Sequence, residues 1–313
     1  MVEVVLPLLL TIAYLMVLGG VAKSAEESPR LARLARHPIA FGLALGVYAT
    51  SWTFYGGVGL AHRSGWAFLA ISLGVTLSCI AIPFLWEPLA RILRRHQLTS
   101  VADLFAFRFQ SQLAGVLVTL FMVAALLPYL SLQLRAIADA ADFVGEGRTP
   151  PWMGMVYAAA LSVFAALLGA RYADPERAGR GLLATLALES VVKLLCMAFV
   201  GVATLQGVFG GLAGLEAHLE ATPEALERLQ SPLREGEAPF NALLLLAFVA
   251  AFLLPRQFHV AFAAKPDGRD PRGERHLRTA AWVLPLFLLL LNLPLPILFF
   301  AGEMLADPGT PPD

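Results

Sequence analysis

The 313 residues are 58% hydrophobic and only 15% charged, with a mean hydropathy of +0.70. Soluble domains have roughly 45–50% apolar and about 25% charged residues, so the composition excludes an ordinary soluble protein and indicates a polytopic, all-α membrane protein. The 23 basic and 23 acidic side chains cancel, and we expect no nucleic-acid partner. Cys79 and Cys196 both lie in apolar stretches, so the sequence holds neither a disulfide framework nor a zinc-binding pattern.

Eight apolar stretches are long enough to cross a bilayer, which takes about 20 residues. We expect spans at residues 4–22, 39–61, 66–86, 113–143, 152–170, 181–209, 239–263 and 280–302. With the N-terminus outside, sixteen basic residues fall in the inner loops and four in the outer loops. This bias predicts a multi-pass protein of the bacterial inner membrane with the N-terminus outside.

Two loops carry helix signals of their own. Ser100 is followed three residues later by Asp103, which is the capping-box arrangement, and it predicts a short amphipathic helix at the inner surface. In the acidic loop 210–238, Thr222-Pro223-Glu224 reads as an N-cap, a first-turn proline and a first-turn acid. That loop predicts a solvated outer helix, with a lid or partner surface as the alternative.

The second span is interrupted by polar and glycine residues over 50–57, Thr-Ser-Trp-Thr-Phe-Tyr-Gly-Gly. Unwound backbone is tolerated in a membrane only where it lines a cavity or is buried in protein. Freed carbonyls and hydroxyls are the oxygen ligands that sodium prefers, so this interruption predicts part of an ion site. Alternatively, the glycines serve close helix packing. The expected ion ligands are Thr50, Ser51 and Thr53, and the expected solute-binding or gating residues are Trp52, Thr53, Phe54 and Tyr55.

The seventh span is interrupted at residues 254–259, Leu-Pro-Arg-Gln-Phe-His. Pro255 removes a helical donor, and an arginine within a span almost always faces protein or water rather than lipid. We therefore expect Arg256 and Gln257 to bind or gate a solute. The alternative is an arginine that a carboxylate elsewhere in the bundle neutralises. Two interrupted spans together indicate a solute and ion site near the membrane midplane.

The fourth span adds Tyr129 and Gln133, neutral polar residues that we expect to face the same site. Two pairs spaced four residues apart, Arg135 with Asp139 and Glu189 with Lys193, predict neutralisation along one helix face. No phosphate-binding loop, catalytic triad or metal motif is present. We expect no catalytic residues and no cofactor beyond a sodium ion.

Several of these runs resemble the sodium:solute symporter family. They are 48–56, Tyr-Ala-Thr-Ser-Trp-Thr-Phe-Tyr-Gly; 63–68, Arg-Ser-Gly-Trp-Ala-Phe; 99–103 with Arg108-Phe109; and the runs 127–134 and 254–260. More narrowly, the chain is similar to the branch that is fused to sensor histidine kinases of the CbrA type. The resemblance implies a LeuT-type fold, in which an extra N-terminal helix, 4–22, precedes two inverted five-helix repeats. The first repeat would cover about 39–209 and the start of the second about 239–302.

On that map the 313 residues form a partial transporter-like domain, because the chain stops two helices into the second repeat and the family's next helix normally supplies hydroxyl ligands to sodium. The resemblance implies that the domain is the input part of a two-component sensor kinase, whose C-terminal kinase module would be its partner, together with sodium, membrane lipid and a small solute such as an amino acid. The alternatives are part of a stand-alone sodium-coupled amino-acid or carboxylate symporter, or a receptor that binds solute without moving it.

Overall fold

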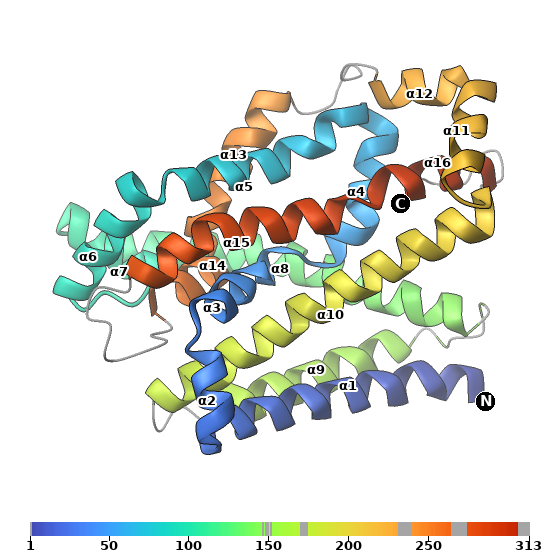
Figure 1. Cartoon of the computed structure of the whole chain (residues 1–313). Helices are drawn as coiled ribbons and strands as arrows, with labels where there is room; N and C mark the ends of the chain where they lie inside the picture. Colours follow the sequence, from blue (N-terminus) through green and yellow to red (C-terminus); the bar gives the residue numbers. More distant parts are fainter. Residues whose placement is uncertain are drawn as a thin grey trace.

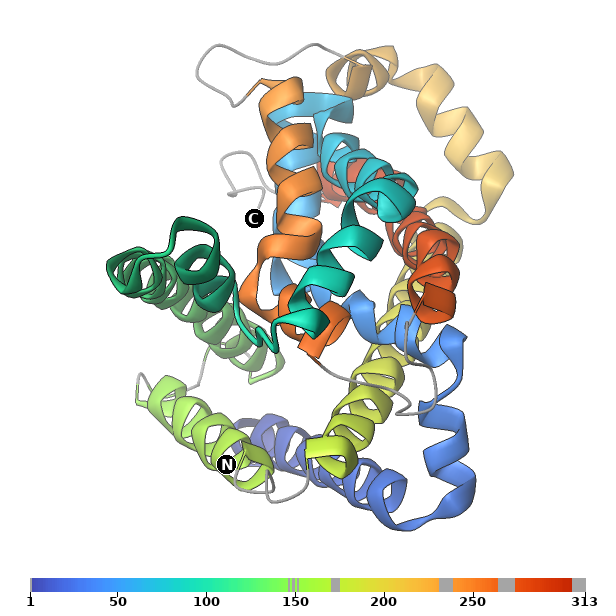
Figure 2. The same ribbon diagram turned by 90° about the vertical axis from the view of Figure 1, so that its left-hand side faces the viewer.

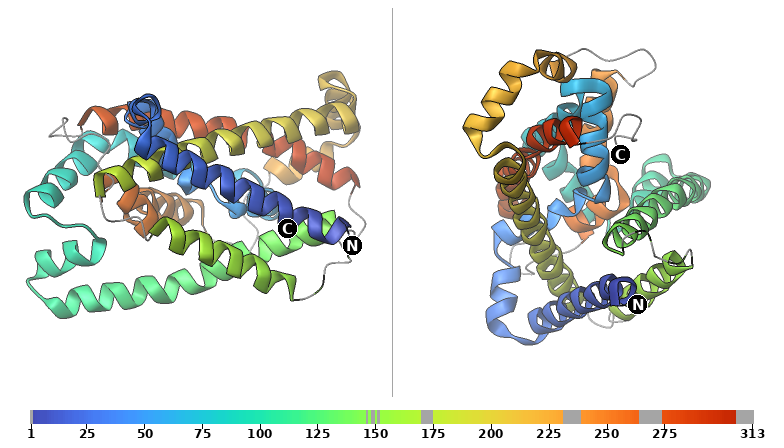
Figure 3. Two further views of the ribbon diagram at one scale, coloured as in Figure 1. Left: turned by 90° about the horizontal axis from the view of Figure 1, so that it is seen from below. Right: turned by 90° about the vertical axis from the view of Figure 1, so that its right-hand side faces the viewer.

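The computed structural model describes residues 2–145, 147, 150, 152–169, 175–230, 239–263 and 274–305. Within these ranges the chain is helical and contains no strand, which confirms the all-α class. Four long helices form one side of the molecule in Figure 1: α1 (Val2–Glu27), α8 (Gln112–Val144), α9 (Met153–Gly169) and α10 (Pro175–Phe209). α1 lies along α10, as Figure 3 shows from below.

The other side is built from helices of the second, third, seventh and eighth predicted spans (Figure 2). α5 packs along α13 and also contacts α15. These helices and their 3-10 and π-helical extensions are α4 (Ser51–Ser64), η2 (Gly65–Phe68), α5 (Leu69–Ile80), η3 (Ile82–Trp86), α13 (Phe240–Leu253), α14 (Pro255–Phe258), η4 (His259–Ala263), α15 (Glu274–Asn292) and α16 (Leu295–Leu305).

Short helices connect the spans. The connector α2 (Pro29–Ala35) leads into α3 (Pro38–Ala44), which begins the second predicted span and is extended by η1 (Leu45–Tyr48). The remaining connectors are α6 (Glu87–Arg95), α7 (Val101–Phe109), α11 (Leu212–Ala221) and α12 (Pro223–Gln230). α7 begins with the predicted capping box, and α12 begins at the proline that follows Thr222.

Helices cover the predicted spans, but not one helix for each span: Ser51–Ile80 runs from the second predicted span, 39–61, into the third, 66–86. In the described part of the chain, five helical stretches are long and apolar enough to cross a membrane, or six if the bent pair Phe240–Leu253 and Pro255–Phe262 counts as one. The shorter apolar helices Pro38–Tyr48 and Met153–Leu167 account for two more. One stretch, Ser51–Ile80, changes direction at Gly65, whose φ of 53° belongs to the left-handed region. Figure 1 shows α4 and α5 running in different directions.

The main core surrounds α3 and η1, which pack against α10 and α15. Close approach depends on glycine at two positions of this segment. A Cβ at Gly42 would lie 2.6 Å from Val283 of α15, and one at Gly46 would lie 2.4 Å from the Ser190 hydroxyl of α10. Ser190 in turn donates a hydrogen bond to the Leu43 carbonyl at 2.7 Å. The segment before the first interruption is therefore held firmly between two long helices.

Candidate functional site at two helix breaks

The first interruption lies at Ala49 and Thr50. η1 ends at Tyr48, Ala49 and Thr50 are extended, and α4 begins at Ser51. The Thr53 hydroxyl accepts a hydrogen bond from the Thr50 amide at 3.1 Å and so helps to start the new helix. The break therefore stands at the start of the predicted run 50–57 rather than in its middle.

Most of that predicted run is helical, and its glycines pack against side chains. A Cβ at Gly56 would lie 2.6 Å from the Trp52 indole nitrogen one turn earlier. A Cβ at Gly57 would reach Leu295 of α16 at 3.4 Å. Because both residues lie inside α4, the expectation that Gly56 and Gly57 unwind the span is wrong.

The second interruption lies at Leu254, as predicted. Leu254 is extended, with φ −57° and ψ 134°, between the end of α13 and the start of α14. Pro255 stands at the first helical position of α14, where its missing N–H costs no hydrogen bond. The two helical parts meet at an angle of 44°.

Arg256 and Gln257 join the second break to the first. The guanidinium of Arg256 donates to the Tyr129 hydroxyl and, at 3.5 Å, to the Tyr48 carbonyl. The same group lies 4.7 Å from the centre of the Tyr129 ring, within cation–π range. The Gln257 amide donates to the Leu45 carbonyl at 3.1 Å. Tyr48 is the last residue of η1, where donors and positive charge are favourable, and Leu45 is its first residue.

The alternative for Arg256, neutralisation by a carboxylate, is not seen among the described residues: none of the ion pairs formed among them includes this arginine. Its Nε atom is buried without a hydrogen-bond partner in this part of the chain. Arg256 therefore keeps positive charge and one unused donor next to the first break. The two other predicted pairs do form, Arg135 with Asp139 at 3.5 Å and Lys193 with Glu189 at 2.6 Å.

Gln133 of α8 caps the start of α4. Its Oε1 accepts hydrogen bonds from the Ser51 amide at 3.2 Å and from the Ser51 hydroxyl at 2.6 Å. The Gln133 Nε2 atom is buried and has no partner among the described residues. Gln133 thus lies at the first break, and the Ser51 hydroxyl donates its hydrogen bond to Gln133.

Two cavities meet at the breaks. The first has a volume of about 420 Å³ and is lined by residues from both broken spans, with Trp52 and Thr53 among them. The second, of about 970 Å³, is lined by Ser51, Phe54, Tyr55 and Gln133 together with residues of α1 and α10. Three residues line both cavities: Thr50, Tyr129 and Arg256. Gln257 is fully buried and lines neither.

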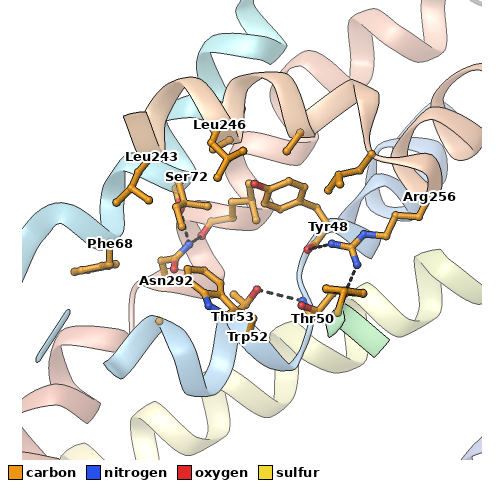
Figure 4. A pocket seen from close by; sticks show the side chains of 17 residues that line it. Tyr48, Thr50, Trp52, Thr53, Phe68, Ser72, Leu243, Leu246, Arg256 and Asn292 are labelled. Atoms are coloured by element: carbon orange, nitrogen blue, oxygen red, sulfur yellow. Dashed lines mark hydrogen bonds between the residues drawn. The ribbon is translucent and has the colours of Figure 1, made fainter. Parts of the chain in front are cut away.

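The first cavity has a second polar end that the sequence reasoning missed (Figure 4). The Asn292 amide of α15 donates to the Ser72 hydroxyl of α5 at 2.9 Å and to the Leu288 carbonyl at 2.7 Å. Figure 4 places this pair away from Arg256, with Trp52 and Thr53 nearby. The signal was present, since Asn292 is a single amide in an otherwise apolar run and asparagine side chains in such runs hydrogen-bond to neighbouring helices.

A second missed contact is made by Lys193 of α10. Its ammonium donates to the Ala49 carbonyl at 2.7 Å while it pairs with Glu189. The sequence predicted the pair but not its position at the first break, because the spacing within one helix does not show what the pair faces across the bundle.

Comparison with known proteins shows the family to which the chain belongs. A model of the sodium:solute symporter family matches residues 33–305. The chain is 27% identical over 260 residues to the uncharacterized symporter YhjB of Bacillus subtilis (strain 168), which covers 80% of this chain and 48% of that protein. It is 37% identical over 102 residues to the uncharacterized symporter YodF of the same organism, covering 31% of the chain and 20% of that protein.

The chain thus spans about half the length of YhjB and a fifth of YodF. No solved structure matches the chain. The family model covers most of the chain, from α2 to the end of α16, and includes both helix breaks and the residues that link them. The chain belongs to the sodium:solute symporter family.

Proposed function

We propose that the first cavity binds a small solute with a carboxylate group, with amino acids as the favoured class, in a transporter-like domain that moves or senses this solute. The observation that carries the proposal is the position of Arg256. Its guanidinium spans from the second helix break to the first, has no carboxylate partner in the described residues and lines the cavity. A planar cation with an unused donor is suited to a carboxylate.

The first cavity is favoured over the second because both broken spans contribute to its wall. Its volume of about 420 Å³ lies in the range of about 300–1,000 Å³ that is common for small-molecule sites. Apolar side chains of α13 form one side, and polar groups stand at both ends, with Arg256 at one and Asn292 at the other. An amino acid combines these features, since it has a carboxylate, an ammonium group and a side chain.

Family membership supports sodium as the coupling ion and a bacterial inner membrane as the location. Thr50, Ser51 and Thr53 remain our proposed ion ligands. The inverted-repeat arrangement and the outside position of the N-terminus are also proposals, supported by the matched helix breaks and by the distribution of basic residues.

For the parent protein we propose a sensor histidine kinase whose input domain is this transporter-like unit. The motif runs around the two breaks support it, whereas the printed names of the relatives support a stand-alone symporter. Incubating the native polypeptide with ATP labelled on the γ-phosphate distinguishes the two. An acid-labile phosphoprotein is expected for the kinase, and lack of labelling together with solute uptake would favour the symporter.

The solute site is tested by thermal unfolding of the purified protein in detergent with each of the twenty amino acids in turn. We expect at least one of them to raise the Tm of the wild type by mass action. Arg256→Gln should lose this rise. Arg135→Gln is the matched control because Arg135 is an exposed arginine on α8, and it should keep the rise. The proposal fails if no amino acid raises the Tm or if Arg256→Gln responds like the wild type.

A further inference from the structure

Lys193 places a positive charge at the first helix break. Its Nζ lies 2.7 Å from the Ala49 carbonyl oxygen and 2.6 Å from Glu189 Oε1. Its side chain is 16% exposed and that of Glu189 is 28% exposed, so both charges are largely withdrawn from solvent. Lys193 also lines the second cavity together with Thr50 and Ser51.

The Ala49 carbonyl is free of helical hydrogen bonding. Ala49 follows the last residue of η1 and has ψ 124°, and α4 starts two residues later. A carbonyl released in this way is the kind of oxygen that a broken helix offers to a cation. In this chain an ammonium already occupies that oxygen.

The same two oxygens are ligands that suit a sodium ion. A carboxylate and a backbone carbonyl are hard oxygen donors, and the Lys193 nitrogen lies within 2.7 Å of one oxygen from each group. An ammonium is a compact point charge with three donors and no acceptor. Sodium and the Lys193 ammonium therefore compete for one position.

The surrounding helices keep Lys193 in place. One turn earlier on α10, Ser190 is fully buried and bonds to the Leu43 carbonyl of α3. Gly46 leaves room for this approach. This contact holds α10 close to the segment α3–η1 that leads to Ala49. The Lys193 ammonium can therefore reach the Ala49 carbonyl.

We propose that the Lys193 ammonium acts as the cation of the first helix break. It lies between the Ala49 carbonyl and the Glu189 carboxylate and thereby prevents sodium from binding these two oxygens. The inference rests on the proposed ion and solute site, and it concerns only the Ala49 carbonyl and the Glu189 carboxylate, not the proposed sodium ligands Thr50, Ser51 and Thr53. Removal of the ammonium leaves Glu189 as a largely buried, uncompensated charge. Sodium then becomes the natural replacement.

The test compares thermal unfolding of the full chain in sodium chloride and in choline chloride at equal ionic strength, without solute. For Lys193→Met we expect sodium to raise the Tm by about 2 °C at ten times its dissociation constant. Wild type and Lys193→Arg, which keeps the charge, should show a smaller rise, limited to sodium bound at the proposed ligands Thr50, Ser51 and Thr53. The double variant Glu189→Gln/Lys193→Met should show only this smaller rise as well, because no charge then needs a partner.

A sodium response as large in the wild type as in Lys193→Met would overturn the inference, and so would a folded Lys193→Met without any response. Lys193→Gln, which keeps a donor for the Ala49 carbonyl, is the second variant if Lys193→Met is unstable. Recovery of either variant in sodium but not in choline supports the inference, and failure of both to fold in sodium contradicts it. The amino-acid response of the wild type is measured separately, so the solute site can stand if this inference fails.

Discussion

At the scale of single residues, polar side chains from distant segments hydrogen-bond to backbone groups in and beside the first break. Each of these contacts links residues far apart in the sequence, and three of the four use a carbonyl of η1 or of Ala49, which follows it. The pairs are Arg256 with the Tyr48 carbonyl, Gln257 with the Leu45 carbonyl, Lys193 with the Ala49 carbonyl and Gln133 with the Ser51 amide. Buried backbone groups require such partners, and in a membrane water does not replace them.

Replacement of Gln133 by methionine should destabilise the protein. The Ser51 amide and hydroxyl lose their shared acceptor, and a buried donor left without a partner costs about 1–3 kcal/mol. Thermal unfolding in detergent measures the loss. Ser131→Ala is the control, because Ser131 is exposed and its hydroxyl bonds only to its own helix. Equal stability of the two variants would show that the cap contributes nothing.

At the scale of helices, the sequence predicted the helix starts and breaks that depend on a few neighbouring residues. The capping box at Ser100 and the break at Leu254 were found from the sequence because a serine, an acid and a proline act within a few residues. The first break could not be placed correctly in this way. It lies at Ala49 and Thr50 because contacts from α8, α10 and α14 act there, and spacing within one span does not reveal them.

Acidification should remove the contribution of the α7 capping box. Partial burial raises the pKa of Asp103, but hydrogen bonds from Thr99 and Ser100 outweigh this effect and leave the pKa below its ordinary value of 3.8. A lowered pKa means that the stabilisation is complete above the ordinary value and is lost as the pH falls through the folded-state value.

Asp103→Asn should therefore be less stable than the wild type near neutral pH, and the gap should narrow as the pH falls below about 4. The Tm of both proteins, measured between neutral and acidic pH, tests this expectation. A gap of constant size would show that the Asp103 carboxylate does not stabilise α7 through its charge.

The packing of α5 on α13 should depend on Gly74. A Cβ at this position would lie 2.3 Å from the Leu244 carbonyl and 2.8 Å from Ala247. Gly74→Ala should therefore cost about 1–3 kcal/mol through overpacking. Gly20→Ala on α1 is the control because nothing lies within 4 Å of its added Cβ. Thermal unfolding compares the two variants. An unchanged Tm for Gly74→Ala would mean that α5 and α13 can move apart at this position without loss of stability.

At the scale of the whole molecule, the basic connectors gather at one end. α2, α6, α7 and the start of α15 lie at the left of Figure 1, whereas the N-terminus and the α11–α12 pair lie at the right. Composition and hydropathy predicted the spans and this separation of charge. The cavities, by contrast, depend on which side chains meet across the bundle, and Asn292, Ser72 and Lys193 entered the site only through the structure.

The orientation is tested with single cysteines in a background of Cys79→Ala and Cys196→Ala. His96→Cys follows α6 and Glu224→Cys lies on α12, and both positions are exposed. In intact cells an impermeant thiol reagent should label the cysteine at 224 and leave the one at 96 unlabelled until the cells are opened. Labelling of both positions from the outside would exclude the proposed topology.

The central claim is that solute binds between the two helix breaks, and cysteine protection tests it most directly. In the same background, Ala250→Cys lies in the first cavity and Ala136→Cys in the second. An amino acid that raises the Tm should slow thiol labelling at 250 and leave labelling at 136 unchanged, and Arg256→Gln should abolish the protection. Protection at 136 alone, or equal labelling at 250 with and without the amino acid, would contradict a solute site between the breaks.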